Sequence, residues 1–519
     1  MKKYFLIHPL FFALIPILAL YNSNKQLLNF HELVLPLFLA LLLTFVFFLI
    51  FKLITKNFSK AVLLTTAFLI IFFFFSRLSE IFTLFLSFFK VSFLHNLANY
   101  LALVFFILII VVVSYLVSVY RKSFKNLHKY LFYAGLFLLL SFSVGIISYC
   151  FASYDEIELD NKVKFSQNNL KSNSYPDIYY LVFDGHARSD ILKELYNYNN
   201  QEFINYLKSK GFFVAEESRA NYPQTYLSMS SALNLSYLDN VGKNSGKESK
   251  DRGILLKLIE KNKVYELLEN FNYSFVSVNN PWRGARKNRV DINLVKTKDL
   301  SDFNFTLLKS TPLKFFLIMD YTSKYFKNRV LATFDSLPKV ASIEENTFVY
   351  AHTISPHPPF LFTKNGELKD NLNLASRDGS HYFETADTTK EGYRQGYLDQ
   401  LHFIDQKIKQ TVDSVLAQYP QGTQQPIIII QSDHGPGMMT DWKSMEKTNL
   451  DERFSILNAY YVPEDLKAKL YDSITPVNTF RLLFNHLFDQ KFELLEDKSY
   501  FATWEQPFNF TDVTERLKQ

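Results

Sequence analysis

Three short apolar runs of the chain end beside residues that can bind a metal ion. The runs and their neighbours are Ile178–Phe183 with Asp184, Thr347–Ala351 with His352, and Pro426–Gln431 with Asp433 and His434. Such runs are typical of buried strands, and ligands of open α/β sheets bind beyond the carboxyl ends of the strands. Carboxylate and imidazole groups together suit Zn²⁺ or Mn²⁺ better than Ca²⁺, which takes oxygen ligands. The sequence therefore predicts a metal site at one edge of a sheet.

Each of these residues also has a purely structural interpretation. Asp184 is followed by Gly185, a common turn pair, and residues 433–437 could form a turn as well. His352 and His357 flank a proline-rich loop that could present both imidazoles to a ligand or simply bury them. An unbroken apolar strand that runs into adjacent Asp and His is less usual for a mere turn, so the metal site is the favoured interpretation.

Thr225 is the predicted nucleophile. Pro223 restricts the backbone before it, and the small residues after it favour a helix, so Thr225 lies at or near a helix N-terminus. Free backbone N–H groups and the positive end of the helix dipole favour an anionic phosphoryl or sulfuryl group there. A metal ion beside the hydroxyl would lower its pKa and make it a nucleophile. On local sequence alone, a plain helix N-cap is the favoured interpretation of Thr225.

The segments around these residues alternate between strand-like and helix-like patterns. Further strands are predicted at 212–215, 273–278 and 456–462, and helices at 189–209, 225–238, 254–269, 392–418 and 475–488. This alternation is typical of a mostly parallel sheet with helices on both faces. The sequence therefore predicts an α/β domain over residues 176–519. Residues 153–175, which are rich in Asn, Ser, Lys and Asp, are predicted to be a linker.

The first 152 residues have the composition of a membrane domain. A bilayer span needs about 17–25 mostly apolar residues. Five stretches approach or meet this length, at 4–20, 32–53, 60–77, 98–119 and 130–151. The run Ile81–Leu94 is short and contains Lys90, so it is predicted to be interfacial or re-entrant, with a sixth span as the alternative. No small-residue cleavage site follows Leu20, which favours a retained first helix over a signal peptide.

The distribution of charge fixes the predicted orientation and excludes some functions. Residues 1–152 contain twelve Lys or Arg and only two acidic residues, Glu32 and Glu80, whereas the whole chain has a net charge of +6. The basic charge thus belongs to the apolar part, which argues against nucleic-acid binding. Five spans with the N-terminus inside satisfy the positive-inside rule and place the C-terminal domain outside. No span contains Asp, so the relay groups expected of a transporter are lacking.

Cysteine usage narrows the chemistry of the C-terminal domain. The one cysteine, Cys150, lies in the fifth predicted span. Residues 176–519 therefore have no disulfide, no thiolate metal site and no cysteine nucleophile. The domain must rely on its hydrophobic core for stability, which about 345 residues can supply.

Taken in order, these motifs resemble the sulfatase/alkaline-phosphatase superfamily. The likeness covers roughly Pro176 to Phe488 and is carried by PDIYYLVFDG, NYPQT, SPHPPF and IIQSDHG. It is strongest to the membrane-anchored branch, which includes lipoteichoic acid synthases and phosphoethanolamine transferases, and the five-span N-terminal domain is similar to that branch as well. The resemblance implies an alkaline-phosphatase-like fold for the C-terminal domain.

The resemblance also implies roles for individual residues. Metal ligands would be Asp184, Thr225, Asp433 and His434; Thr225 would also be the catalytic nucleophile; His352, His357 and Arg286 would face the substrate. Sulfatases proper use a formylglycine made within a Cys/Ser-x-Pro-x-Arg context, and this motif is absent around Thr225. Asp184 is not one of a pair of aspartates, so the resemblance implies one divalent metal ion, Zn²⁺ or Mn²⁺.

The resulting hypothesis is a multi-pass protein of a bacterial cytoplasmic membrane with a catalytic domain outside. It would move a phosphate-containing lipid headgroup to an envelope glycan or lipid, through a phospho-threonine intermediate. Two alternatives stay open: a hydrolase of phosphate or sulfate esters, and an inactive scaffold that keeps the fold. The expected partners are the lipid bilayer and a lipid or glycan substrate, with no nucleic acid, and the oligomeric state is left open.

Overall fold

The computed structural model divides the chain into two compact units. The first comprises Met1–Ser153 with Asp299–Met319, and the second comprises Tyr154–Lys298 with Asp320–Gln519. The structure describes residues 3–25, 28, 30–87, 93–151, 175–278, 291–295, 301–315, 319–369, 377–385 and 388–517. Most of the predicted linker, 153–175, therefore lies outside the described residues.

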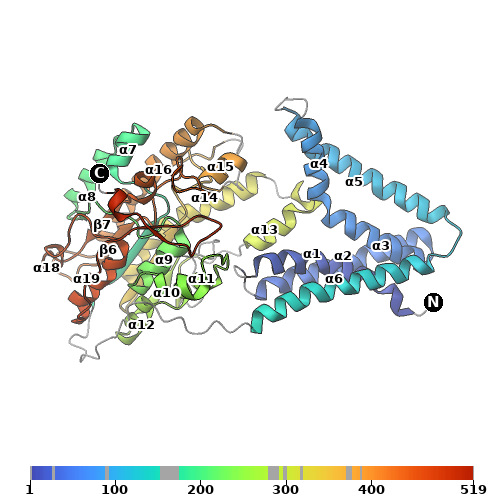
Figure 1. The fold of residues 1–519 in the computed structure, drawn as a ribbon, viewed down its shortest axis with the longest axis horizontal. Helices are drawn as coiled ribbons and strands as arrows, with labels where there is room; N and C mark the ends of the chain where they lie inside the picture. The colour runs from blue at the N-terminus through green and yellow to red at the C-terminus, as the bar shows by residue number, and fades with distance from the viewer. Residues whose placement is uncertain are drawn as a thin grey trace. The chain divides into compact units, whose positions relative to one another are not determined.

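The first unit is helical. Its main helices are α1 (His8–Asn24), α2 (Val34–Thr55), α3 (Phe58–Phe73), α4 (Phe75–Ser87), α5 (Phe93–Val119) and α6 (Lys125–Phe151) (Figure 1). Helix α1 contacts α2, α3 and α6, and α3 also contacts α5. The buried residues between them are aromatic and small, such as Phe68 and Phe72 of α3 against Ala13 of α1 and Ala102 of α5. Small residues let helix backbones approach closely where no water drives packing.

The structure supports fewer spans than the five that the sequence predicts. Within the described residues, three helices are long and apolar enough to cross a membrane: Phe30–Thr55, Ala98–Val119 and Lys125–Tyr149. The number rises to four if α3 and α4, which bend by 52° where they meet, form one broken span. Helix α1 has only 17 residues and contains Pro16. The number five therefore stays a prediction, and Ile81–Leu94 falls on the end of α4, residues outside the description and the start of α5.

A segment from the second half of the sequence belongs to the helical unit. It contains α13 (Asp302–Lys309) and the 3₁₀ helix η4 (Pro312–Phe315). Ser301 caps α13 by accepting a hydrogen bond from the backbone N–H of Asn304. Phe303 is buried in the core of the helical unit. The predicted domain boundaries at 152 and 176 do not anticipate this segment.

The second unit is built around a seven-stranded sheet. Its strands are β1 (Ile178–Phe183), β2 (Phe213–Val214), β3 (Ser274–Ser277), β4 (Ile292–Asn293), β5 (Thr347–Thr353), β6 (Ile427–Gln431) and β7 (Asn458–Tyr461). Their order is β2-β7-β6-β1-β5-β3-β4. The neighbouring strands from β6 to β4 pair in parallel. At the other edge β7 pairs antiparallel with both β6 and β2. The predicted mostly parallel α/β sheet is confirmed.

Both faces of the sheet are covered, as the apolar strands require. Successive side chains of a strand point to opposite faces. Tyr179, Leu181 and Phe183 share a core with α8 (Gln201–Ser209) and α16 (Lys390–Leu416). On the other face the ring of Tyr180 packs 5.0 Å from that of Phe480 in α19 (Pro476–Phe488). The central strand β1 is therefore buried on both sides and cannot shift its register cheaply.

Two predicted helices are each broken in two. Residues 189–209 form α7 (Ser189–Tyr196) and α8, and residues 254–269 fall in α11 (Gly253–Glu260) and α12 (Lys263–Asn270). Helix α12 has its own start signal, because the Asn262 side chain accepts a hydrogen bond from the N–H of Tyr265. The apolar periodicity continues across both breaks, which is why it does not show them. The predicted helix at 225–238 is α9 (Thr225–Asn234).

Candidate active site

The three central strands bring their polar ends together. In the register, Val182 of β1 lies opposite His352 of β5 and Gln431 of β6. Parallel strands in this register end at one level, so Asp184 follows β1 where Asp433 follows β6. Strand β5 runs two residues further than predicted, to Thr353, so His352 lies within the strand rather than after it. The predicted meeting of strand ends is thus realised at the middle of the sheet.

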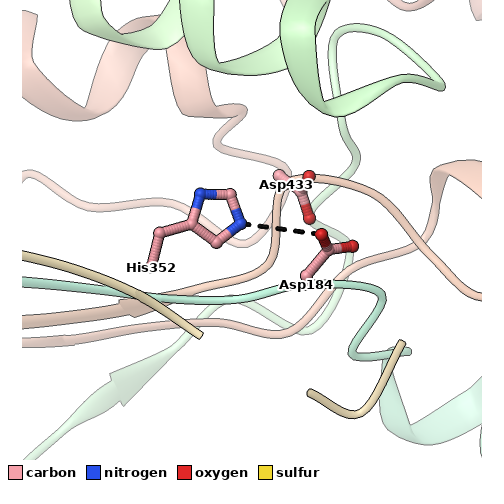
Figure 2. A group of neighbouring side chains, drawn as sticks. All are labelled: Asp184, His352 and Asp433. Carbon is pink, nitrogen blue, oxygen red and sulfur yellow. Dashed lines mark ion pairs between the residues drawn. The ribbon is translucent and has the colours of Figure 1, made fainter. Parts of the chain in front are cut away.

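Asp184, His352 and Asp433 converge at this edge (Figure 2). Each offers one ligand atom, and these three atoms lie within 4.8 Å of one another. His352 Nε2 is 3.8 Å from Asp184 Oδ2. All three residues are buried. A cluster of two carboxylates and one imidazole at this spacing has the composition of a site for a transition-metal ion.

The carboxylate oxygens of this cluster lack the partners that buried charge requires. Neither Asp184 Oδ1 nor Asp433 Oδ2 accepts a hydrogen bond among the described residues. Burial raises the pKa of Asp184 to about 8, and burial together with the charge of Asp184 raises the pKa of Asp433 to about 8. Two buried carboxylates side by side without a counter-charge are unstable, and a divalent cation removes that penalty. The donor set therefore fits a metal ion.

Thr225 and His434 complete the cluster. Thr225 Oγ1 lies 3.1 Å from His434 Nε2, which is 3.4 Å from both Asp184 Oδ1 and Asp433 Oδ2. His434 Nδ1 lies 2.9 Å from the carbonyl oxygen of Gly435, to which it can only donate. This bond places the proton on Nδ1 and leaves Nε2 as an acceptor or metal ligand. Burial lowers the pKa of His434 well below its usual range, which keeps the imidazole neutral.

The structure explains why glycine follows His434. A Cβ atom on Gly435 would lie 2.0 Å from the carbonyl oxygen of Glu452, so no side chain fits there. The N–H of Gly435 also donates to the carbonyl of Arg453 at 2.8 Å. The loop that carries Asp433 and His434 is therefore pressed against the segment around Arg453, which fixes the direction of both ligands.

Helix α9 presents Thr225 at its first residue. Gln224 is the N-cap, and its side chain donates to the carbonyls of Ala502 and Thr503 at 3.2 and 3.0 Å. One turn into the helix, Ser228 Oγ donates to the backbone carbonyl of Asp433 at 2.6 Å. Helix α9 and the loop after β6 are thus joined directly, and the N-terminal end of the helix faces the cluster, where it favours an anion.

His357 lies beside the cluster on the proline-rich loop. Its N–H donates to the carbonyl of Asp184 at 2.9 Å, and its ring centre is 6.2 Å from that of His434. Gln400 of α16 holds the loop by donating to the carbonyls of Pro356 and His357 at 3.1 and 3.0 Å. The His357 side chain keeps 20% of its surface exposed, whereas that of His352 is fully buried. His357 is thus the histidine that a substrate can reach.

Sequence reasoning missed a buried ion pair next to the site. Arg453 Nη1 donates to Asp378 Oδ2 at 2.6 Å and to the carbonyl of Gly435 at 3.0 Å, while its Nε donates to the carbonyl of Pro223 at 2.8 Å. Asp378 also accepts from the Tyr393 hydroxyl at 2.7 Å and lies 3.8 Å from His357 Nε2. Burial opposes ionisation, but His357 and Arg453 hold the pKa of Asp378 below its usual range. No local motif surrounds either residue, so the sequence offered no signal.

We expect Asp378→Asn to destabilise the second unit strongly. The substitution leaves Arg453, which is 1% exposed, as a buried and uncompensated charge. Breaking a buried pair in this way costs about 3–5 kcal/mol. Urea unfolding in detergent, followed by tryptophan fluorescence, measures the loss. The matched control is Glu216→Gln, which breaks the exposed ion pair with Lys208 and is expected to change stability by about 0.5 kcal/mol or less. Equal effects of the two substitutions would contradict the role of the buried pair.

The structure thus brings together most of the residues predicted for the site. Asp184, Thr225, His352, Asp433 and His434 lie in one cluster, and His357 lies against it. His352, predicted on the substrate side, lies among the ligand atoms instead, while its role stays a prediction. Arg286 lies outside the described residues, so its predicted contact with substrate is untested.

A mostly parallel sheet with carboxylate and histidine side chains at its central strand ends, and a hydroxyl at a helix N-terminus, is the arrangement typical of alkaline-phosphatase-like enzymes. The model of the sulfatase family matches residues 195–480, more than half of the chain. The chain belongs to the sulfatase family and is an enzyme of the phosphotransferase or sulfatase type. Thr225, His352, Asp433 and His434 lie inside the matched range, and Asp184 lies just before it.

Solved structures with a similar course of the chain include three transferases. The membrane protein lipooligosaccharide phosphoethanolamine transferase A from Neisseria meningitidis is 11% identical, with 94% of this chain and 95% of that chain covered and a TM-score of 0.39. The periplasmic domain of EptC from Escherichia coli, in complex with Zn, is 10% identical, with 66% and 93% covered and a TM-score of 0.41. The periplasmic domain of phosphoethanolamine transferase EptC from Campylobacter jejuni is 13% identical, with 62% and 92% covered and a TM-score of 0.37. A search of the curated proteins gives no match. The assignment to the family rests on the family model.

Proposed function

We propose that the chain is a metal-dependent phosphoryl-group transferase that uses Thr225 as its nucleophile. The observation that carries the proposal is the position of Thr225 Oγ1, 3.1 Å from His434 Nε2 at the start of α9. It lies beside buried carboxylate oxygens that accept no hydrogen bond from any residue that the structure describes. The residues that would hold one divalent ion, Zn²⁺ or Mn²⁺, are Asp184, Thr225, Asp433 and His434, with His352 as a further donor. When bound, the ion would stabilise negative charge on the transferred group and on the threonine oxygen.

The other steps of the reaction are carried out by residues of the chain. The N-terminus of α9 binds the anionic phosphoryl group, and the bond from Ser228 to the Asp433 carbonyl keeps the nucleophile aligned with the ligands. Thr225 first gives up its hydroxyl proton to solvent, and the resulting alkoxide Oγ forms a bond to phosphorus while the bond from phosphorus to the leaving oxygen breaks. His357, partly exposed at the mouth of the site, gives a proton to that leaving oxygen. The acceptor hydroxyl then takes the phosphoryl group from Thr225, and the proton of that hydroxyl returns to His357. The same alkoxide is released again when the acceptor takes the phosphoryl group.

The substrate we propose is a phosphate-containing lipid headgroup, passed on to an envelope glycan or lipid. The support is that the same chain carries helices able to cross a membrane, so the catalytic unit is tethered where lipids are the available phosphodiesters. The basic residues of the helical unit favour an N-terminus inside a bacterial cytoplasmic membrane and a catalytic unit outside it. In this arrangement the first half-reaction releases diacylglycerol.

The half-reaction is tested by intact mass. The full chain, loaded with Zn²⁺ or Mn²⁺, is incubated with a phospholipid mixture and no acceptor, so that a transferase stalls after its first step. The expected result is a headgroup-phosphate adduct on Thr225 that is absent from Thr225→Ala and Asp433→Ala. Steady release of a free phosphorylated headgroup without an adduct would indicate the hydrolase instead. Neither adduct nor bound metal would leave the inactive scaffold.

A further inference from the structure

An apolar cavity that is open on one side lies in the helical unit, where Leu35 and Leu39 of its lining keep 56% and 50% of their surface exposed. Its volume is about 400 Å³, and its walls come from α1, α2, α3 and the segment that contains α13 and η4. Leu39 and Leu43 of α2, Phe72 of α3 and Leu307 of α13 are among the lining residues. Among the described residues of the lining, Asn304 and Thr311 are the only polar ones. A cavity of this size reaches the range of small-molecule sites, but it offers almost nothing that could bind a polar ligand or hold water.

The segment that contains α13 and η4, which forms one wall of the cavity, is fixed to the helices of this unit by hydrogen bonds and by a buried aromatic ring. Ser76 donates its N–H to the carbonyl of Ser310 at 3.1 Å, and Lys314 Nζ donates to Asn99 Oδ1 at 2.7 Å and to Ser79 Oγ at 3.1 Å. Phe303 is 3% exposed, and its ring packs edge-on to that of Tyr21 with centres 6.1 Å apart. The cavity is therefore a built feature of the helical unit and not a gap beside a loose segment.

The cavity lies toward one end of the bundle. Its lining includes Phe72 and Phe73 at the end of α3, extends along α2 from its start to Val46, and reaches Ile17 in the middle of α1. Lys25, after α1, reaches the carbonyl of Gly145 near the end of α6 at 2.8 Å, so the end of α6 is there too. The opposite end carries Lys52, Lys56 and Lys60, which the positive-inside rule places in the cytoplasm.

We propose that this cavity binds an acyl chain of a glycerophospholipid from the outer leaflet of the membrane. The inference deepens the proposed function, on which its orientation rests. An acyl chain is the apolar occupant that a bilayer supplies at every point along a spanning helix, and the lining matches it. Lys309 and Lys314 each follow a lining residue of the segment that contains α13 and η4 and supply positive charge suited to a lipid phosphate. The segment inserted from the second half of the sequence thus acts as the wall of a lipid site.

Native mass spectrometry of the full chain tests the proposal. The chain is purified in mild detergent, incubated with mixed micelles of dioleoyl phosphatidylethanolamine and dioleoyl phosphatidylglycerol, and its retained lipid is counted. Leu39→Trp fills the cavity from α2, and Leu307→Trp fills it from α13. Overfilling a site weakens binding by about tenfold or more. The control is Phe38→Trp, because Phe38 is next to Leu39 on α2 and similarly exposed but does not line the cavity.

We expect about one retained phospholipid per chain in the wild type and in Phe38→Trp, and a loss of about tenfold or more in both filling variants. Two variants from different walls keep the test decisive if one of them fails to fold. A wild type without retained lipid, or filling variants that retain as much as the wild type, would overturn the proposal.

A second readout separates this proposal from the proposed function. The filling variants are expected to slow turnover of the dioleoyl lipids while leaving hydrolysis of soluble bis(p-nitrophenyl) phosphate unchanged. If Thr225→Ala retains both activities, the proposed function fails. The number of retained lipids still shows whether the cavity binds a phospholipid. If the filling variants slow both substrates equally, the cavity is not a lipid site of this reaction and the inference fails alone.

Discussion

Replacing Thr225 by alanine is expected to lower kcat by roughly a thousandfold or more, because the step that forms the covalent intermediate loses its nucleophile. Thr225→Ser keeps a hydroxyl at the first residue of α9 and is expected to retain measurable turnover. The measurement is steady-state hydrolysis of bis(p-nitrophenyl) phosphate at saturating metal, with bound metal determined on the same samples.

The control for this prediction is another hydroxyl of the same helix. Ser230 Oγ donates to the carbonyl of Leu255 at 2.9 Å, away from the cluster. Ser230→Ala removes that bond, which costs about 1 kcal/mol of stability, and is expected to leave kcat unchanged. Turnover in Thr225→Ala close to that in Ser230→Ala would show that Thr225 is only the start of a helix.

Asp433→Asn is expected to abolish stoichiometric metal binding. The amide cannot supply the negative charge that balances the ion, and metal affinity should fall by more than the roughly 10- to 100-fold seen when outer-shell partners are lost. In the wild type, metal at a thousand times its Kd stabilises the fold by about 4 kcal/mol. We expect the variant to lose this metal-dependent rise in melting temperature, measured with and without a chelator.

Asp405 provides a matched control for the loss of metal. It is also a buried carboxylate, but it lies 2.8 Å from His186 Nε2 and outside the metal cluster. Asp405→Asn is expected to lower stability while the wild-type amount of metal stays bound. If Asp433→Asn binds metal as tightly as Asp405→Asn does, the cluster is not the metal site.

Sequence patterns were sufficient where a single strand or helix end carries the information. The unbroken apolar runs predicted β1 and β6 within one residue, and Asp184 and Asp433, which follow these runs, lie in the cluster that could hold a metal ion. The position of His352 was less well predicted, because its strand continues for as long as it pairs with β1, whatever its own composition. The residue at which a strand ends depends on its pairing with the neighbouring strand. The sequence of one strand alone does not show that pairing.

The residues that sequence reasoning missed act through contacts between distant segments. Asp378 and Arg453 meet from positions 75 residues apart, and neither lies in a pattern with a known period. The segment around α13 packs against helices that precede it by more than two hundred residues, so its short apolar pattern looks like that of any surface helix of the second unit. Contacts of this kind are fixed by the tertiary fold and leave no local signature.

Arg453 shows how a residue that touches no substrate can limit the evolution of this enzyme. One guanidinium joins the segment before Thr225, the loop after His434 and the carboxylate of Asp378. A lysine has one point of charge and no planar fork, so it cannot serve the three acceptors at once. Any single replacement at this position must therefore disturb three segments together, and compensation would need simultaneous changes in all of them. Substitutions that change the substrate are therefore expected at the exposed edge of the site. The buried part of the site is held in place by the Arg453 side chain.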